Sequence, residues 1–195
     1  MTDVPILSVN GLRKEFPTRA KGLMGAPGSI LAVDDISFDI ARGEVLGLVG
    51  ESGCGKTTTG RLVLRLIEPT AGSIRFDGID ISRLAPAAMR MMRRRMQIVF
   101  QDPFGALNPR MTAGELITEP LVVHGVGTPL EREARLRDLM DRVGLATWQA
   151  GRFPHEFSGG QRQRICIARA LALAPELLVC DEAVSALDVS VQAQI

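Results

Sequence analysis

The sequence shows no excess of either charge and no long apolar run, and each absence excludes a class of protein. Its 195 residues contain 23 Lys and Arg against 22 Asp and Glu, a balance that leaves no electrostatic footprint for DNA or RNA as the main partner. No run approaches the ~18 apolar residues that a bilayer-spanning helix needs. Residues 1–11 have neither the basic start nor the long apolar stretch of a signal peptide. We therefore expect a soluble, cytoplasmic protein unless a partner tethers it.

Cysteine is scarce as well. The three cysteines, Cys54, Cys166 and Cys180, are scattered through apolar or Gly-rich stretches, and an odd number placed in this way indicates neither a disulfide framework nor a zinc site. Reduced thiols in a cytosolic protein are the expectation. Cys54 lies in a Gly-rich segment, where we expect it to be open to alkylation.

Apolar residues are numerous enough for a packed core, at 46% of the chain against 23% charged, and the length suits one domain. Apolar runs predict strands at residues 6–9, 30–40, 45–49, 72–77, 97–100 and 177–180. Apolar residues at helical spacing predict helices at residues 56–67, 86–96, 131–143 and 160–173. The runs 45–49 and 177–180 are continuously apolar, as in parallel strands covered on both faces. The Gly, Pro and basic residues of segment 17–29 predict a surface loop.

One predicted helix, residues 86–96, carries a basic cluster of Arg90, Arg93 and Arg94 beside a stripe of methionines. Such a cluster could contact a nucleotide or a lipid. A solvated helix face over the methionine stripe is the interpretation that we favour.

Between the predicted strand 45–49 and the predicted helix 56–67 lies a match to the P-loop pattern, Gly50-Glu51-Ser52-Gly53-Cys54-Gly55-Lys56-Thr57. Glycines let backbone N–H groups turn inward around phosphates, and the helix adds the positive end of its dipole. In this pattern Lys56 reaches the β and γ phosphates and the Thr57 hydroxyl binds Mg²⁺. A chance Gly-rich turn is the alternative, and the strand–loop–helix context makes it remote.

Two carboxylates, Asp181 and Glu182, follow the predicted strand 177–180. Asp181 is suited to hold Mg²⁺, directly or through water, and Glu182 to polarise an attacking water. An Asp-Glu pair at a strand end is usually an exposed loop, but its occurrence downstream of a P-loop strengthens the catalytic interpretation.

The segment 157–161 contains Ser158 and Gln161 at the spacing of a capping box, just before the predicted helix 160–173. Gly159 and Gly160 leave the start of this helix bare enough for a phosphate to approach. A plain capped helix explains the same residues equally well.

Taken together, these segments resemble the ABC ATPases. Ser158-Gly159-Gly160-Gln161 is similar to the signature motif, Gln101 in Val99-Phe100-Gln101-Asp102-Pro103 to the Q-loop, and Ser185-Ala186-Leu187-Asp188 to the D-loop. The order and spacing match from about residue 6 onward. Phe16 resembles the A-loop aromatic that stacks on adenine, with a core residue as the alternative. The implied fold is α/β: a RecA-like P-loop NTPase core with an N-terminal antiparallel β-subdomain and a helical signature subdomain at about residues 103–160.

The resemblance implies the site residues and the cofactors ATP and Mg²⁺. Glu182 and Gln101 would be catalytic, and Thr57, Gln101 and Asp181 would hold the metal. The nucleotide would be bound by Phe16, Gly50, Glu51, Ser52, Gly53, Cys54, Gly55, Lys56, Thr57, Thr58, Ser158, Gly159, Gly160 and Gln161. The last four residues would act on ATP held by a second ATPase subunit, in a head-to-tail pair.

Within the superfamily, residues 100–112 and 180–195 resemble the dipeptide and oligopeptide importer ATPases, as do the 17–29 insertion and His155-Glu156. The implied function is an ATPase at the cytoplasmic face of the cell membrane that drives solute import, with peptides as the expected solute. Related importers carry nickel or glutathione, so these residues do not specify the substrate. Its implied partners are a paralogous ATPase subunit, transmembrane permease subunits docked against about residues 103–150 and, indirectly, an extracytoplasmic solute-binding protein. No nucleic-acid partner is expected.

The chain departs from the family at two points. Ala183-Val184 replaces the commoner Pro-Thr, away from the chemistry. The family also carries a switch-loop histidine after the strand that follows residue 182, whereas the two histidines here are His124 and His155. That strand lies in the centre of the family's sheet. We therefore expect the chain to be a C-terminally truncated fragment, poorly stable and hydrolytically weak on its own.

Two other functions stay open. A soluble ABC ATPase serving DNA repair or translation would be expected to show coiled-coil insertions or tandem domains, and neither is found. A module that holds ATP without turnover is supported by the missing switch histidine alone. An unrelated P-loop kinase or GTPase does not explain residues 158–161.

Overall fold

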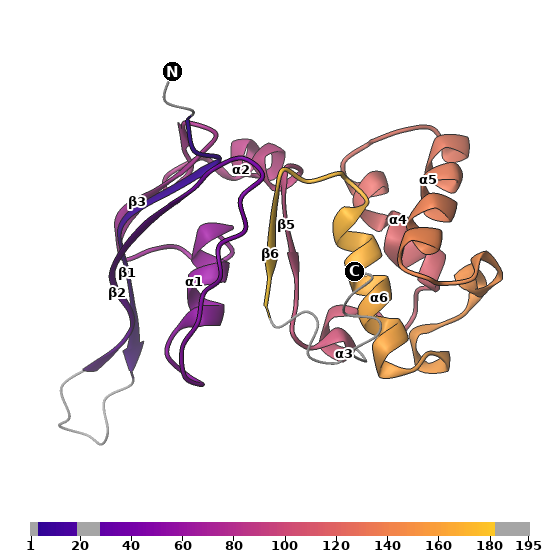
Figure 1. Ribbon diagram of the computed structural model, residues 1–195, viewed down its shortest axis with the longest axis horizontal. Coiled ribbons are helices and arrows are strands. Elements are labelled where there is room, and N and C mark those ends of the chain that lie inside the picture. Colours follow the sequence, from indigo (N-terminus) through magenta and orange to yellow (C-terminus); the bar gives the residue numbers. More distant parts are fainter. Residues whose placement is uncertain (1–3, 19–27, 182–195) are drawn as a thin grey trace. The chain divides into compact units, whose positions relative to one another are not determined.

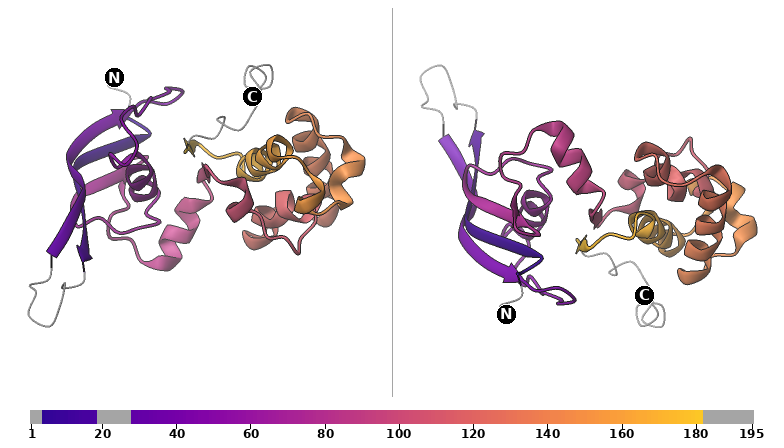
Figure 2. Two further views of the ribbon diagram at one scale, coloured as in Figure 1. Left: turned by 90° about the horizontal axis from the view of Figure 1, so that it is seen from below. Right: turned by 90° about the horizontal axis from the view of Figure 1, so that it is seen from above.

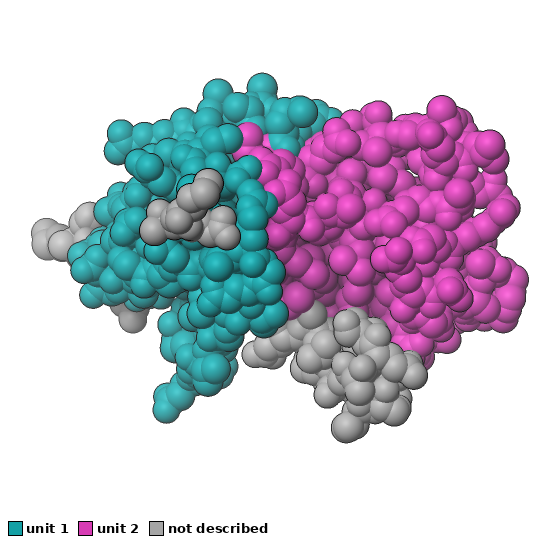
Figure 3. Space-filling model, turned by 45° about the horizontal axis from the view of Figure 1, so that its top comes forward, with its two compact units in different colours: residues 1–91 teal, residues 92–195 magenta. Residues whose placement is uncertain are grey.

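The computed structural model describes residues 4–18 and 28–181. It divides into two compact units, unit 1 (Met1–Met91) and unit 2 (Met92–Ile195), which Figure 3 shows in different colours.

Unit 1 is built on an antiparallel sheet with the strand order β2-β1-β3-β4 (Figure 1). Its strands are β1 (Leu7–Thr18), β2 (Gly28–Ile40), β3 (Ala71–Phe76) and β4 (Ile79–Asp80). The register of β1 and β2 runs from Leu7 opposite Ile40 to Thr18 opposite Gly28, with irregularities between Val9 and Glu15. The strands predicted at 6–9, 30–40 and 72–77 are thus confirmed, and the first is longer than its apolar run. Of the loop predicted at 17–29, residues 17–18 and 28–29 instead belong to β1 and β2, where they pair with each other, and residues 19–27 lie outside the described residues.

The turn between β3 and β4 follows from its sequence. Asp77 and Gly78 have φ values of 51° and 77°, which is the left-handed pair that a two-residue hairpin turn requires and that Asp-Gly adopts readily. The helix α1 (Lys56–Val63) lies over one face of the sheet (Figures 1 and 2) and fully buries Leu62. It ends earlier than the predicted residue 67 because Arg65 takes φ 48°. Likewise, α2 (Pro86–Arg93) ends before the predicted residue 96, because Met96 begins a strand.

The prediction of a buried strand at residues 45–49 is wrong for this structure. These residues have no regular secondary structure, and Val45 and Val49 are 95% and 94% exposed. A buried parallel strand needs a parallel neighbour and cover on both faces. Every strand described in unit 1 belongs instead to the antiparallel sheet, so the apolar run finds no such neighbour there.

Unit 2 joins a parallel strand pair to a group of helices. β5 (Met96–Val99) pairs with β6 (Leu177–Cys180), confirming both predicted strands, although β6 is covered less than expected, since Leu177 is buried and Cys180 is exposed. The helices are α3 (Pro103–Ala106), α4 (Ala113–Val123), α5 (Pro129–Arg142) and α6 (Gly159–Leu171), with short 3-10 turns η1 (Thr147–Gly151) and η2 (Pro154–Glu156). α6 lies between the strand pair and helices α4 and α5 (Figures 1 and 2). No described helix has the length and hydropathy to span a bilayer.

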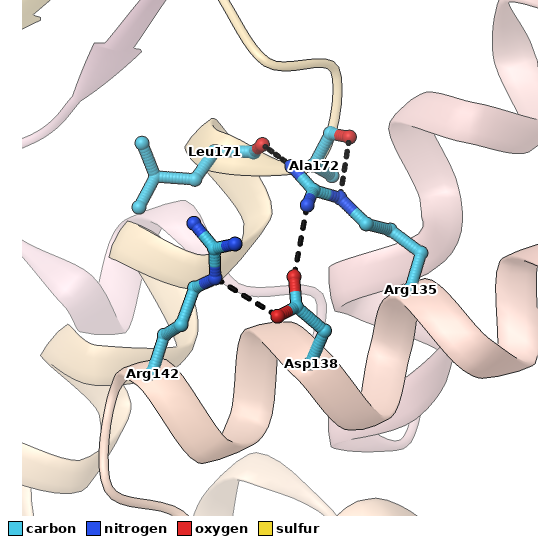
Figure 4. Close-up of polar contacts among 5 residues, drawn as sticks. All are labelled: Arg135, Asp138, Arg142, Leu171 and Ala172. Carbon is cyan, nitrogen blue, oxygen red and sulfur yellow. Dashed lines mark hydrogen bonds and ion pairs between the residues drawn. The ribbon is translucent and has the colours of Figure 1, made fainter.

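α5 and α6 cap each other's C-terminal ends. Arg135 of α5 donates to the carbonyl oxygens of Leu171, at 3.0 Å, and Ala172, at 3.4 Å, at the end of α6 (Figure 4). Arg164 of α6 donates to the carbonyl oxygens of Val143 and Gly144 at the end of α5. The exchange requires the two helices to run antiparallel, and it places a cation at the negative end of each helix dipole. Gly144, with φ 67°, follows the C-cap of α5, which ends close to the predicted residue 143.

Candidate functional site

The 50–57 loop of unit 1 is folded around the side chain of Lys56. The Lys56 ammonium donates to the carbonyl oxygens of Gly50 and Glu51, each at 2.7 Å. The backbone N–H of Cys54 donates to the Glu51 carbonyl at 3.3 Å, and the Cys54 sulfur lies 3.8 Å from the Lys56 nitrogen. The loop therefore curls into a tight bend with a cation inside it.

Gly55 joins this loop to α1 and to the sheet. Its φ of 97° is accessible to glycine, and a Cβ here would lie 2.3 Å from the carbonyl oxygen of Ala32 in β2. Gly55 is the N-cap of α1, makes no side-chain cap, and is followed by a first turn without acidic residues. The N–H groups and the positive dipole end of α1 are thus available to an anion.

A cavity of ≈390 Å³ extends from the loop along β2. The loop contributes Cys54, Gly55 and Lys56 to its wall, and β2 contributes residues 31–34 and Ile36. The cavity therefore has a cation, Lys56, at the loop and a wall along the strand that is apolar except for Asp34. The motifs of the sequence do not mark this β2 wall, because it is formed by the packing of α1 against the strand.

Phe16 lies beside this wall. It pairs across the sheet with Ile30, the residue before Leu31 of the cavity wall, and it is 38% exposed. The core alternative for Phe16 therefore does not describe its environment. The ammonium of Lys14 lies 5.0 Å from the centroid of the Phe16 ring. Sequence reasoning missed this contact, although residues two apart on a strand point to the same side.

Gln101 and Asp181 lie together in unit 2. β5 and β6 are parallel, with Val99 opposite Cys180, and the backbone N–H of Asp181 donates to the Val99 carbonyl at 3.0 Å. Both residues therefore follow the carboxyl ends of neighbouring strands, the edge at which open α/β sheets bind ligands. Asp102, next to Gln101, accepts hydrogen bonds from the backbone N–H groups of Phe104 and Gly105 and so begins α3.

The predicted capping box at the start of α6 is present. The Ser158 hydroxyl oxygen accepts from the Gln161 N–H at 3.3 Å, and the Gln161 side-chain oxygen accepts from the Ser158 N–H at 3.0 Å. The Ser158 hydroxyl hydrogen and the Gln161 amide hydrogens stay available as donors. Gly159 and Gly160 lie in the first turn, where a helix has no internal acceptor for its N–H groups. The cap and an anion site are therefore compatible at this terminus.

The remaining predicted site residues are Thr57, Thr58, Glu182 and the segment 185–188. Thr57 and Thr58 belong to α1 of unit 1. Glu182 and the segment 185–188 lie outside the described residues. Among residues 4–18 and 28–181, the His, Cys, Asp and Glu side chains form no group of three suited to a metal.

Comparison with known proteins adds the family context. Residues 33–185 match the family described as ABC transporter. The chain is 57% identical over 195 residues to a protein of Brucella ovis that bears the provisional name of peptide import ATP-binding protein. It is 53% identical over 191 residues, or 97% of its length, to the oligopeptide transport ATP-binding protein AppF of Bacillus subtilis. The chain spans 59% of the Brucella protein and 58% of AppF.

Solved structures show the same architecture. The ATP-binding cassette MJ0796, solved as a dimer in a post-hydrolysis state bound to ADP and Pi, superposes with a TM-score of 0.86 at 30% sequence identity. The match covers 97% of this chain and 79% of that one. The expected α/β fold is thereby confirmed.

Proposed function

This chain belongs to the ABC transporter family, and on that premise we propose that it binds ATP and hydrolyses it to drive solute import. The observation that carries the proposal is the 50–57 loop, with Lys56 inside its bend and the uncapped N-terminus of α1 behind it. Such a terminus is a ready anion site. The adjoining cavity along β2, with Phe16 beside it, suits the ribose and base.

Binding would exchange the partners of Lys56. Its ammonium now donates to two loop carbonyls, and the β and γ phosphates would offer it charged oxygens, which form stronger hydrogen bonds. The glycines of the loop, with Gly53 and Gly55 at φ 83° and 97°, let the backbone N–H groups turn toward the same phosphates.

We propose that Thr57, Gln101 and Asp181 would hold Mg²⁺. They offer hydroxyl, amide and carboxylate oxygens, which are the ligands that Mg²⁺ prefers. When bound, the ion would neutralise charge on the β and γ phosphates. Glu182 would act as the general base that orients and polarises the attacking water, and Gln101 would contact the γ-phosphate.

The start of α6 is proposed to act on the nucleotide of a second subunit. Ser158 and Gln161 keep hydrogen-bond donors while capping α6, and the dimeric state of MJ0796 supports pairing of two such cassettes. ATP would then lie between the 50–57 loop of one subunit and residues 158–161 of the other. We propose a paralogue as the second subunit.

Peptides are the proposed solute, because the Brucella and Bacillus relatives are named for peptide and oligopeptide transport. A relative from Pectobacterium atrosepticum, 55% identical over 191 residues, is named for glutathione import, which is itself a small peptide. The proposal includes permease subunits as membrane partners, a solute-binding protein as an indirect partner, and a peripheral place at the cytoplasmic face of the membrane. Co-purification with permeases, and not with ribosomes or DNA, would separate this function from a soluble ABC ATPase.

Two variants test binding and hydrolysis separately. Lys56→Ala should abolish the rise in melting temperature that Mg-ATP causes in the parent chain, because the phosphates lose their main cation. Glu182→Gln should keep ATP binding and lose phosphate release, measured in the complete protein assembled with its partner subunits. Unchanged nucleotide binding by Lys56→Ala would refute the phosphate site, and parent-rate hydrolysis by Glu182→Gln would refute the base.

A further inference from the structure

We infer that Lys14 positions the nucleotide base by covering one face of the Phe16 ring with its ammonium group. The base would then stack on the opposite face. This inference rests on the proposed function, because it takes Phe16 as the residue that receives the base.

The contact has the geometry of a cation–π interaction. The Lys14 nitrogen lies 5.0 Å from the centroid of the Phe16 ring, inside the ~6 Å over which a cation is attracted to a ring face. Phe16 keeps 38% of its surface exposed, so the ring is partly open although Lys14 lies over it. Lys14 therefore restricts stacking to one side of the ring.

The ammonium is also held in place from a distant segment. It donates to the backbone carbonyl of Glu68 at 2.7 Å, across 54 residues of sequence. A lysine free in solvent samples many rotamers and loses entropy when it is ordered. The Glu68 carbonyl fixes the charge over the ring before any ligand arrives, so less ordering is needed on binding.

The same segment ties Phe16 to the phosphate site. The Glu15 N–H donates to the Thr70 hydroxyl at 3.0 Å, and the Thr70 N–H donates to the Arg13 carbonyl at 2.8 Å. Residues 68–70 follow α1, whose first turn carries Lys56. These bonds join the strand that carries Phe16 to the segment that follows α1, and so connect the base contact to the helix that begins at the phosphate loop.

The charge has a chemical consequence for stacking. An ammonium over one face draws the π electrons of the ring toward itself, which lowers the repulsion that a second aromatic ring meets at the other face. Phenylalanine has no hydroxyl with which to hydrogen-bond the base, so the cation supplies a polar contribution to stacking that the ring alone lacks. Removing the charge should therefore weaken the binding of nucleotides and leave unchanged the binding of phosphate ligands that have no base.

The test compares Mg-ATP with magnesium tripolyphosphate, which has the phosphates without base or ribose, by calorimetric titration of the chain. Lys14→Met keeps the apolar stem and removes the charge. We expect this variant to bind ATP about threefold to tenfold more weakly than the parent. Its affinity for tripolyphosphate should stay within about twofold of the parent value. Lys14→Arg should restore ATP binding, because guanidinium also binds a ring face. The matched control is Arg75→Met, which removes an exposed cation from β3 of the same sheet. It should change the affinity for neither ligand.

A double-mutant cycle shows whether the effect passes through the ring. In a Phe16→Ala background, Lys14→Met should have no further effect on ATP. If Lys14→Met weakened tripolyphosphate binding as much as ATP binding, the inference would be overturned in favour of a direct contact between Lys14 and phosphate. If Lys14→Met weakened ATP binding equally in the parent and in the Phe16→Ala background, the role of the ring would be overturned. If the parent binds neither ligand, or Lys56→Ala binds both as the parent does, the proposed function fails first and the role of Lys14 with it.

Discussion

Replacing Arg135 with methionine should destabilise unit 2, because this guanidinium joins α5 to the C-terminal end of α6. It donates to the carbonyls of Leu171 and Ala172 and, at 2.9 Å, to Asp138, which also accepts from Arg142 (Figure 4). Methionine keeps the apolar stem and a high helix propensity. The substitution therefore isolates the polar contacts.

The expected loss is about 1–2 kcal/mol in the free energy of unfolding. Hydrogen bonds from a charged group contribute about 1.5–3 kcal/mol each when they are well made and protected. The Arg135 side chain is 29% exposed and Asp138 42% exposed, so water replaces part of what is lost. The 3.4 Å contact to Ala172 adds little, whereas the cation at the end of α6 adds about 0.3–1 kcal/mol through the helix dipole.

The assay uses the single tryptophan of the chain, Trp148 in η1 of unit 2. Urea unfolding followed by Trp148 fluorescence reports on this unit, and circular dichroism follows the helices as a whole. The two probes should shift to lower urea together, at an unchanged slope. Asp138→Asn should couple to Arg135→Met in a double-mutant cycle, since the two side chains are in contact.

Arg137→Met is the matched control. Arg137 lies on the same helix, but its guanidinium pairs with Glu133 on the exposed face, where the two side chains are 66% and 55% exposed. Such a pair contributes no more than about 0.5 kcal/mol. Equal effects of the two substitutions would refute the capping of α6 as the source of stability.

Two other predictions concern the loop and the thiols. Gly55→Ala should abolish Mg-ATP binding in a titration and lower the melting temperature, because the new Cβ would meet the Ala32 carbonyl at 2.3 Å; parent-like binding would contradict the described loop. Burial raises the pKa of the Cys166 thiol from 9.0 to about 11, so the folded chain keeps a proton that the unfolded chain loses between these values. This contribution to stability is fully present below pH 9 and falls as pH rises toward 11, by roughly 2 kcal/mol at pH 10.5. Cys166→Ala should remove that part of the pH dependence from urea midpoints, and identical profiles for parent and variant would contradict it. Iodoacetamide should meanwhile modify exposed Cys54 before buried Cys166.

Much of the local structure could be predicted because its causes lie within a few residues. The capping box of Ser158 and Gln161 spans a single helical turn, and the Asp77–Gly78 turn depends on two backbone conformations. The apolar stripe that predicts α5 repeats within that helix. In each case the residue types themselves specify the hydrogen bond or the φ value, so the pattern is sufficient evidence.

The candidate site was predictable only in part, for the same reason. Its motif residues could be named, since a P-loop requires glycines, a lysine and a threonine at fixed spacing. The cavity wall along β2 has no local signal, because it forms where β2 meets the distant residues 54–56. The anchoring of Lys14 by Glu68 has none either, because the two residues are 54 positions apart in the sequence.

The sequence by itself determined the family, the phosphate loop and the ends of several helices, because these depend on spacing and on intrinsic backbone preferences. Only the tertiary structure decided which apolar runs became strands. Residues 45–49 and 177–180 look alike as sequence, yet the second run pairs with β5 and the first pairs with none of the strands described in its unit. Strand formation requires hydrogen-bond partners from elsewhere in the chain, and hydrophobicity alone does not specify which partner is present.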